Sequence, residues 1–106
     1  MKWLTLPLCK AQIRMEPDFT AEDEILTQYA EDAEEMVLGD TRRTVEELKA
    51  MNTDDPTRVP ASIVQASLLL FTLSYEQHSP ISMQNMYAVP YAYDHKIKRF
   101  IKLTED

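Results

Sequence analysis

The stretch from Ile63 to Gln77, IVQASLLLFTLSYEQ, most constrains what this chain can fold into. It is the most apolar part of the sequence, and the four consecutive large residues Leu68–Phe71 would point to every side of a helix. A surface helix carries one apolar stripe and one polar face, whereas a helix that is apolar all round is enclosed by other elements. The sequence therefore predicts a central helix over about residues 60–78.

The length of 106 residues suits one domain with one core, over residues 1–106. Gly39 is the only glycine, and because β-sheet folds use glycine in turns and bulges, its scarcity favours helices. We therefore expect an all-α fold, a small bundle of about four to five helices around the central one. The longest apolar run is far shorter than the ~20 residues of a membrane-spanning helix, so we expect no membrane association.

The first half of the chain has recognisable capping residues. Thr5 and Pro7 suit the start of a short first helix that turns Cys9 inward and Lys10 outward. A capping box at Thr20 would open an acidic second helix, which Gly39 would end in a left-handed conformation.

The second half has fewer such signals. Thr44 and Glu47 predict a second capping box and a short helix. Pro60 suits the first turn of the central helix. Residues 79–89 show no clear period and are expected to be an extended loop, after which Pro90 opens a last helix. That helix would carry Tyr93, Ile97 and Phe100 on one face.

The remaining helices do not easily enclose a long central one, because two of them are short. Small residues such as Ala66, Ser67 and Ser74 would let a neighbour approach closely. Either a second subunit or the loop over residues 79–89 could supply the missing cover, and burial arguments alone leave both alternatives open.

The net charge of −7 is unevenly distributed. Between Glu16 and Asp55 there are 14 acidic and three basic side chains, a net charge of −11, whereas His95–Leu103 holds four basic side chains and no acidic one. Such a chain repels nucleic acid over most of its surface, and it could attract a second copy head to tail. For any single charge run, a solvated helix face is the simpler interpretation.

Residue patterns typical of enzymes are missing. The two histidines and Cys9 lack metal-ligand spacing, and one glycine cannot build a phosphate-binding loop. The carboxylates of AEDAEE lie beside the apolar stripe, so we expect them on a solvated face. We therefore expect no enzymatic activity, no metal and no cofactor. Tyr87, Tyr91 and Tyr93 lie close in sequence to the basic segment His95–Leu103. They could stack on nucleic acid, but contact with another protein is favoured.

An ordered set of blocks resembles the head–tail connector family of tailed phages and prophages. The blocks are TLPLCKAQIR, the acidic DFTAEDEILTQYAEDAEEMV, the central VPASIVQASLLLFTLSYEQ and the closing VPYAYDHKIKRFIKL. In the central block the resemblance is carried by Pro60, Ile63, Ala66, Leu68, Leu70, Tyr75 and Glu76. Two features depart from the family pattern: Gln77 and His78 follow the Tyr-Glu pair where many relatives have an Arg, and Gly39-Asp40 interrupts the second helix.

The resemblance implies a structural role without catalysis. Members form rings under the portal, extend the DNA channel and dock tail-completion proteins, and DNA passes through without sequence-specific binding. The protein would then reside in the host cytoplasm during assembly and afterwards at the head–tail junction of the virion. A ring needs two different complementary patches on each subunit. The residues expected at these contacts are Glu31, Glu34, Glu35, Arg42, Arg43, Tyr91, Tyr93, Lys96, Lys98, Arg99 and Lys102.

Two other function classes remain open from the sequence. The chain could be a small DNA-binding regulator whose basic tail reaches phosphates, for which salt-sensitive duplex binding would be diagnostic. It could also be an acidic partner-binding protein, such as an anti-repressor or a DNA mimic, which a single defined partner would reveal.

Overall fold

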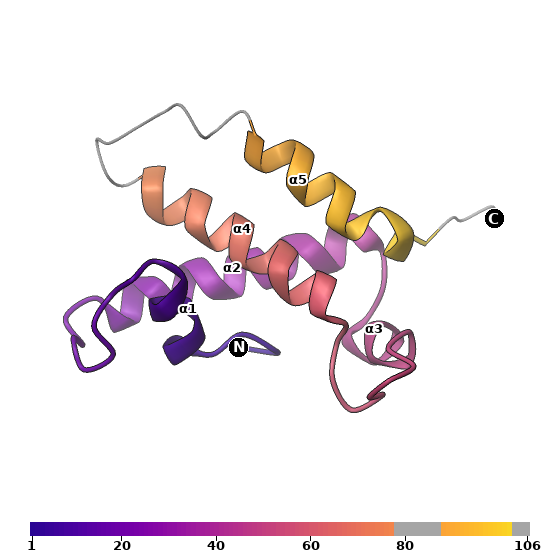
Figure 1. Cartoon of the computed structure of the whole chain (residues 1–106), viewed down its shortest axis with the longest axis horizontal. Helices are drawn as coiled ribbons and strands as arrows, with labels where there is room; N and C mark the ends of the chain where they lie inside the picture. Colours follow the sequence, from indigo (N-terminus) through magenta and orange to yellow (C-terminus); the bar gives the residue numbers. More distant parts are fainter. Residues whose placement is uncertain (78–87, 103–106) are drawn as a thin grey trace.

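The computed structural model describes residues 1–77 and 88–102, which form a bundle of helices without a strand in these ranges. The elements are α1 (Leu6–Gln12), α2 (Asp23–Thr41), α3 (Val45–Ala50), α4 (Ala61–Gln77), α5 (Ala88–Ile97) and the 3-10 turn η2 (Lys98–Phe100). Helix α4 packs between α2 and α5, and α1 covers part of it (Figure 1). The predicted all-α bundle around a central helix is confirmed.

The core forms along α4, where α2 and α5 pack against it. Helix α4 buries Ile63, Ala66, Ser67, Leu68, Leu70 and Phe71. Helix α2 contributes Leu26, Ala30, Ala33 and Val37 at helical spacing, and the C-terminal elements contribute Tyr93, Ile97 and Phe100. The last three are the face predicted from the sequence, so that prediction is confirmed.

The apolar run of α4 is mostly covered by its own chain. Leu68, Leu70 and Phe71 are buried, whereas Leu69 and Leu73 are half-buried. Cover by a second subunit stays a prediction, because no other subunit is present. Most of the loop expected over residues 79–89 lies outside the described residues. Its last two residues, 88 and 89, are helical, because α5 begins before Pro90.

Two predicted helix starts are confirmed. Thr5 caps α1, with its hydroxyl oxygen accepting from the Leu8 amide at 3.3 Å. At α3 the capping box is complete: the Thr44 hydroxyl oxygen accepts from the Glu47 amide at 3.2 Å, and the Glu47 carboxylate accepts from the Thr44 amide at 2.9 Å. Two orphan amides are thereby satisfied at the N-terminus of a short helix.

Both predicted ends of α2 are wrong. The Asp23 amide donates to the backbone carbonyl of Thr20 at 3.2 Å, forming a turn, and no side chain caps the helix. The helix also continues through Gly39, and Arg42 takes the left-handed conformation with φ 59°. Contacts from α5 and the segment after it hold the last turn at Asp40 and Thr41, so tertiary structure extends the helix beyond the glycine.

The prediction that Lys10 points outward is also wrong. Its side chain is buried, and its ammonium lies 2.8 Å from the Asp23 carboxylate. The same ammonium donates to the carbonyl oxygens of Pro17 at 3.2 Å and Phe19 at 2.7 Å. A buried charge is tolerated only when it is paired and hydrogen-bonded, as here. Lys10 therefore fixes the loop that joins α1 to α2.

Among the described helices, none combines the length and the apolarity needed to cross a lipid bilayer.

Replacing Phe71 by Ala should lower the free energy of unfolding by about 3–5 kcal/mol, because the ring is fully buried and its loss leaves a cavity. The matched control is Leu69→Ala on the half-buried neighbouring position, which should cost clearly less. Urea denaturation followed by circular dichroism measures both. Equal losses would show that the two side chains are equally enclosed in solution.

Cys9 is fully buried, and this burial, aided by the nearby negative charge of Glu34, raises the pKa of its thiol to about 11. The thiol should therefore react with a disulfide reagent far more slowly in the folded chain than in urea. Below pH 9 both states keep the proton, so stability is unaffected. From pH 9 to about 11 only the unfolded state ionises, and stability should fall by roughly 1.4 kcal/mol per unit of pKa difference.

The control for that pH dependence is Cys9→Ala, because tyrosines and lysines titrate in the same range. The loss of stability above pH 9 should be smaller in this variant than in the natural chain. Parallel pH profiles of the two proteins, measured by urea denaturation, would contradict the burial of the thiol.

Candidate functional site

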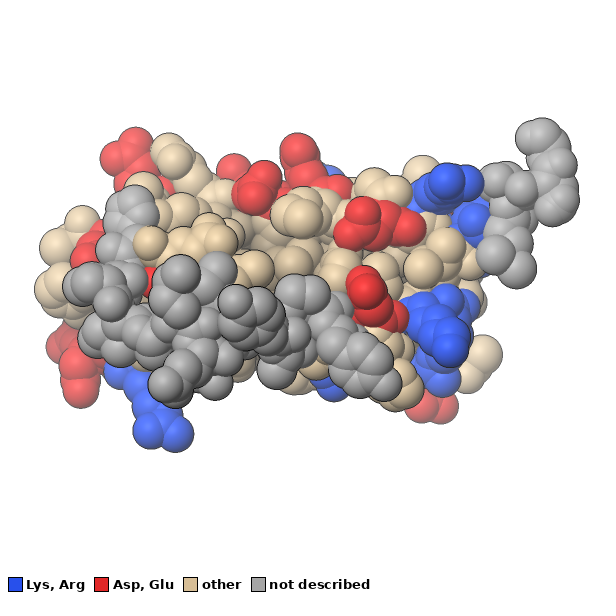
Figure 2. All heavy atoms as spheres, turned by 90° about the horizontal axis from the view of Figure 1, so that it is seen from above, with Lys and Arg blue, Asp and Glu red and all other residues tan. Residues whose placement is uncertain are grey.

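The structure brings two basic segments together at one end of the molecule. The amide of Lys102 donates to the carbonyl oxygen of Thr41 at 2.8 Å, and Arg43 Nε donates to the carbonyl oxygen of Phe100 at 2.6 Å. These bonds hold the end of α2 beside η2. Figure 2 shows a gathering of Lys and Arg side chains at the right end of the molecule, with separate groups of acidic side chains elsewhere on this face. We call Arg42, Arg43, Lys96, Lys98, Arg99 and Lys102 the basic end.

The exposure of the basic side chains follows from the helical period. Ile97 and Phe100 are buried, so Lys98 and Arg99 between them face solvent. The guanidinium of Arg99 lies over the Phe100 ring, 4.8 Å from its centroid. Such a cation–π contact restricts the Arg99 side chain while leaving the charge at the surface.

One ion pair links the basic end to α3. Lys102 lies 3.5 Å from the Glu47 carboxylate, and both side chains are exposed. The pKa of Glu47 is lowered, chiefly by the hydrogen bond from the Thr44 amide and to a lesser degree by Lys102. Exposed pairs of this kind contribute little to stability.

Two adjoining surface hollows lie at the basic end. The larger, about 610 Å³, is lined by Ser62, His95, Lys96, Lys98 and Arg99. The smaller, about 330 Å³, shares His95 and Lys98 and adds Asp94 and Ile101. Ser62 and His95 were not among the residues predicted for this surface. Ser62 joins it only through the packing of α4 against α5.

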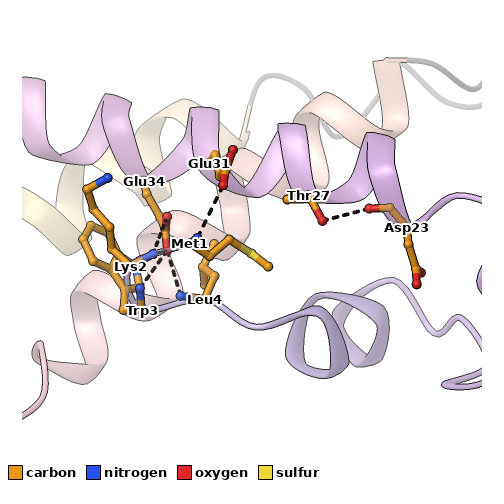
Figure 3. A network of polar contacts seen from close by, with 8 residues as sticks. All are labelled: Met1, Lys2, Trp3, Leu4, Asp23, Thr27, Glu31 and Glu34. Carbon is orange, nitrogen blue, oxygen red and sulfur yellow. Dashed lines mark hydrogen bonds and ion pairs between the residues drawn. The ribbon is translucent and has the colours of Figure 1, made fainter.

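The acidic half of the expected interface needs a correction. Glu31 and Glu35 are exposed, as expected for a solvated face. Glu34 is 1% exposed, so its predicted place on that face, and at a subunit contact, is wrong. Its carboxylate accepts from the backbone amides of Lys2, Trp3 and Leu4, at 2.8–2.9 Å (Figure 3).

This contact fixes the N-terminal segment between α2 and α4. The Met1 ammonium lies 3.4 Å from Glu31, and the indole Nε1–H of Trp3 donates to the Ser67 hydroxyl at 2.8 Å. Extended backbone has unpaired amides, and a buried carboxylate that accepts several of them satisfies both partners. The sequence signal was weak, because Glu34 is one of four carboxylates in AEDAEE.

Of the three tyrosines expected at an interface, only Tyr93 has a described side chain, and it is buried. Tyr93 is 6% exposed, and its hydroxyl donates to the Asp40 carboxylate at 2.6 Å. Burial, and secondarily the bond to Asp40, raises the pKa of Tyr93 above its usual value. The side chain therefore joins α5 to α2 and leaves little surface for a partner. The side chain of Tyr91 and the whole of Tyr87 lie outside the described part of the structure.

In residues 1–77 and 88–102, no three His, Cys, Asp or Glu side chains cluster so that they could hold a metal ion. The cysteine is buried inside the bundle, away from both hollows' linings. The arrangement can bind anionic groups at the basic end through charge and hydrogen bonds.

Substituting Glu34 by Gln should destabilise the chain by about 1–3 kcal/mol, because a neutral amide cannot accept all the hydrogen bonds from the N-terminal amides. Amide hydrogen exchange at residues 2–4 should become faster. The matched control is Glu35→Gln on the exposed face, which should change stability by less than about 0.5 kcal/mol. Urea denaturation measures the stability of both variants. Equal losses would contradict the binding of the N-terminal amides by the Glu34 carboxylate.

Comparison with known proteins matches the chain to one family. The family model described as "Phage gp6-like head-tail connector protein" matches residues 4–100, nearly the whole chain. No curated protein and no solved structure matches the chain significantly. A match of this extent covers every described helix and all of the basic end except Lys102. The chain therefore belongs to the phage gp6-like head–tail connector family.

Proposed function

We propose that this protein is a structural connector that forms a ring under the phage portal. The ring extends the DNA channel and presents a surface to tail-completion proteins, without enzymatic activity. The family match over residues 4–100 carries this proposal. The protein is made in the host cytoplasm and ends at the head–tail junction of the virion.

The distribution of charge supports a head-to-tail ring. Such a ring repeats one heterologous contact, so each subunit presents two different and complementary surfaces. The basic end supplies one, with exposed Arg42, Lys98, Arg99 and Lys102 and half-buried Arg43 and Lys96. Acidic surface supplies the other, including Glu31 and Glu35 on α2. Glu34 and Tyr93 belong to neither surface, because both side chains are buried.

The negative charge of the chain also suits a DNA channel. At −7 overall, most of the surface repels phosphate, so DNA sliding past it does not adhere. Sequence-specific DNA contacts have no place in this function.

Oligomers should appear as the protein concentration rises, and high salt should shift their population, because screening shortens the Debye length from about 10 Å at 0.1 M to about 3 Å at 1 M. Native mass spectrometry over a series of concentrations and ammonium acetate strengths measures this. The same series with the portal protein present is the decisive arm. A chain that remains monomeric in every condition, portal included, would contradict the ring.

A small DNA-binding regulator is the second candidate, favoured by the gathering of six basic side chains at one end. Fluorescence anisotropy with a duplex of mixed sequence separates the two functions. A connector should bind weakly at 0.15 M salt. Submicromolar binding with a steep salt dependence would favour the regulator.

A further inference from the structure

The loop between α1 and α2 projects an acidic and aromatic group of side chains. Glu16 and Asp18 are exposed, and Phe19 beside them is 43% exposed. We call residues 16–19 the acidic loop. Together these side chains offer a partner both negative charge and apolar surface.

The acidic loop is held in place from inside the molecule. The buried ammonium of Lys10 binds the carbonyl oxygens of Pro17 and Phe19, at 3.2 and 2.7 Å. It is fixed in turn by the carboxylate of Asp23 at 2.8 Å. The backbone of the loop is thus tied at two points, so that little conformational freedom is left to lose on binding.

The larger hollow at the basic end has the complementary chemistry. Its lining residues Lys96, Lys98 and Arg99 are cationic, and Ser62 adds a hydroxyl. Arg99 is restricted by its contact with Phe100, and the turn that carries Lys98 and Arg99 is tied to α2 through Arg43 and Lys102. A volume of about 610 Å³ lies within the range of ligand-binding sites and is large enough for several side chains.

The two surfaces lie toward opposite ends of the molecule. In Figure 1 the loop between α1 and α2 is at the left end and η2 is at the right end, along the longest axis of 43 Å. They cannot meet within one chain, yet they can meet between copies. A contact between opposite ends is heterologous, and its repetition closes into a ring when the rotation allows.

We propose that the acidic loop of one copy docks into the basic hollow of the next copy. In this contact Glu16 and Asp18 pair with Lys98 and Arg99, and Phe19 packs against the aliphatic stems that line the hollow. The inference rests on the proposed ring and replaces the acidic face of α2 by the acidic loop as the partner of the basic end.

Cysteine cross-linking tests the contact directly. One chain carries Asp18→Cys and a second carries Lys98→Cys, and the two are mixed under mild oxidation at concentrations where the natural protein is oligomeric. Buried Cys9 does not compete. The 18–98 disulfide should form at least tenfold faster than the 35–98 disulfide of the control pair, Glu35→Cys with Lys98→Cys. Equal rates, or a faster 35–98 pair, would overturn the docking while leaving the ring in place.

Charge reversal gives an independent readout. Asp18→Lys and Arg99→Glu should each raise the midpoint concentration of oligomerisation at least tenfold, and an equimolar mixture of the two variants should recover most of the loss. The controls Asp32→Lys and Lys49→Glu make the same charge changes outside the contact and should have little effect. Sedimentation velocity measures the midpoints, and circular dichroism checks that each variant is folded.

The outcomes separate this contact from the connector function. If Asp32→Lys dissociates the oligomer and Asp18→Lys does not, α2 is the partner and the acidic loop is not. If Arg99→Glu leaves the oligomer intact but weakens binding of duplex DNA or the portal, the hollow serves that ligand, and the docking is wrong. A natural chain that never assembles, with or without the portal, would overturn both the docking and the ring.

Discussion

The enclosure of α4 is the constraint on which the rest of the structure depends. A run of four large apolar residues is stabilised by burial on several sides, and α2 and α5 pack on it from two directions. Once they do, the end of α2 and the turn η2 become neighbours, and the basic side chains of both segments are brought together. The candidate interaction surface is therefore a consequence of how the core is buried.

The sequence predicted those features that depend on local pattern. The run of large apolar residues placed the central helix, and the apolar period placed the buried face of Tyr93, Ile97 and Phe100. Side-chain chemistry placed the caps at Thr5 and Thr44. It failed at α2, because contacts made across the fold extend that helix through Gly39. Propensity is a weak guide wherever such tertiary contacts form.

Buried charges explain most of what could not be predicted about the site. Glu34 and Lys10 look like surface residues in the sequence, yet each satisfies groups that are distant along the chain or lie in a loop. The partners of Glu34 are amides about 30 residues away, so no window of sequence contains the interaction. The sequence predicted one basic run in His95–Leu103 and placed Arg42 and Arg43 among the contact residues. The hollow with Ser62 and His95 could not be predicted, because it forms only when α4 packs against α5.

The hydrogen bond between Trp3 and Ser67 has a practical consequence. Trp3 is the only tryptophan in the chain, and it sits in the N-terminal segment against α4. Its emission wavelength thus reports whether that segment is bound to α4, while ellipticity reports the helices. A shift in emission that precedes the loss of helix would identify a partly unfolded form, in which the bundle persists and the N-terminal segment has dissociated from it.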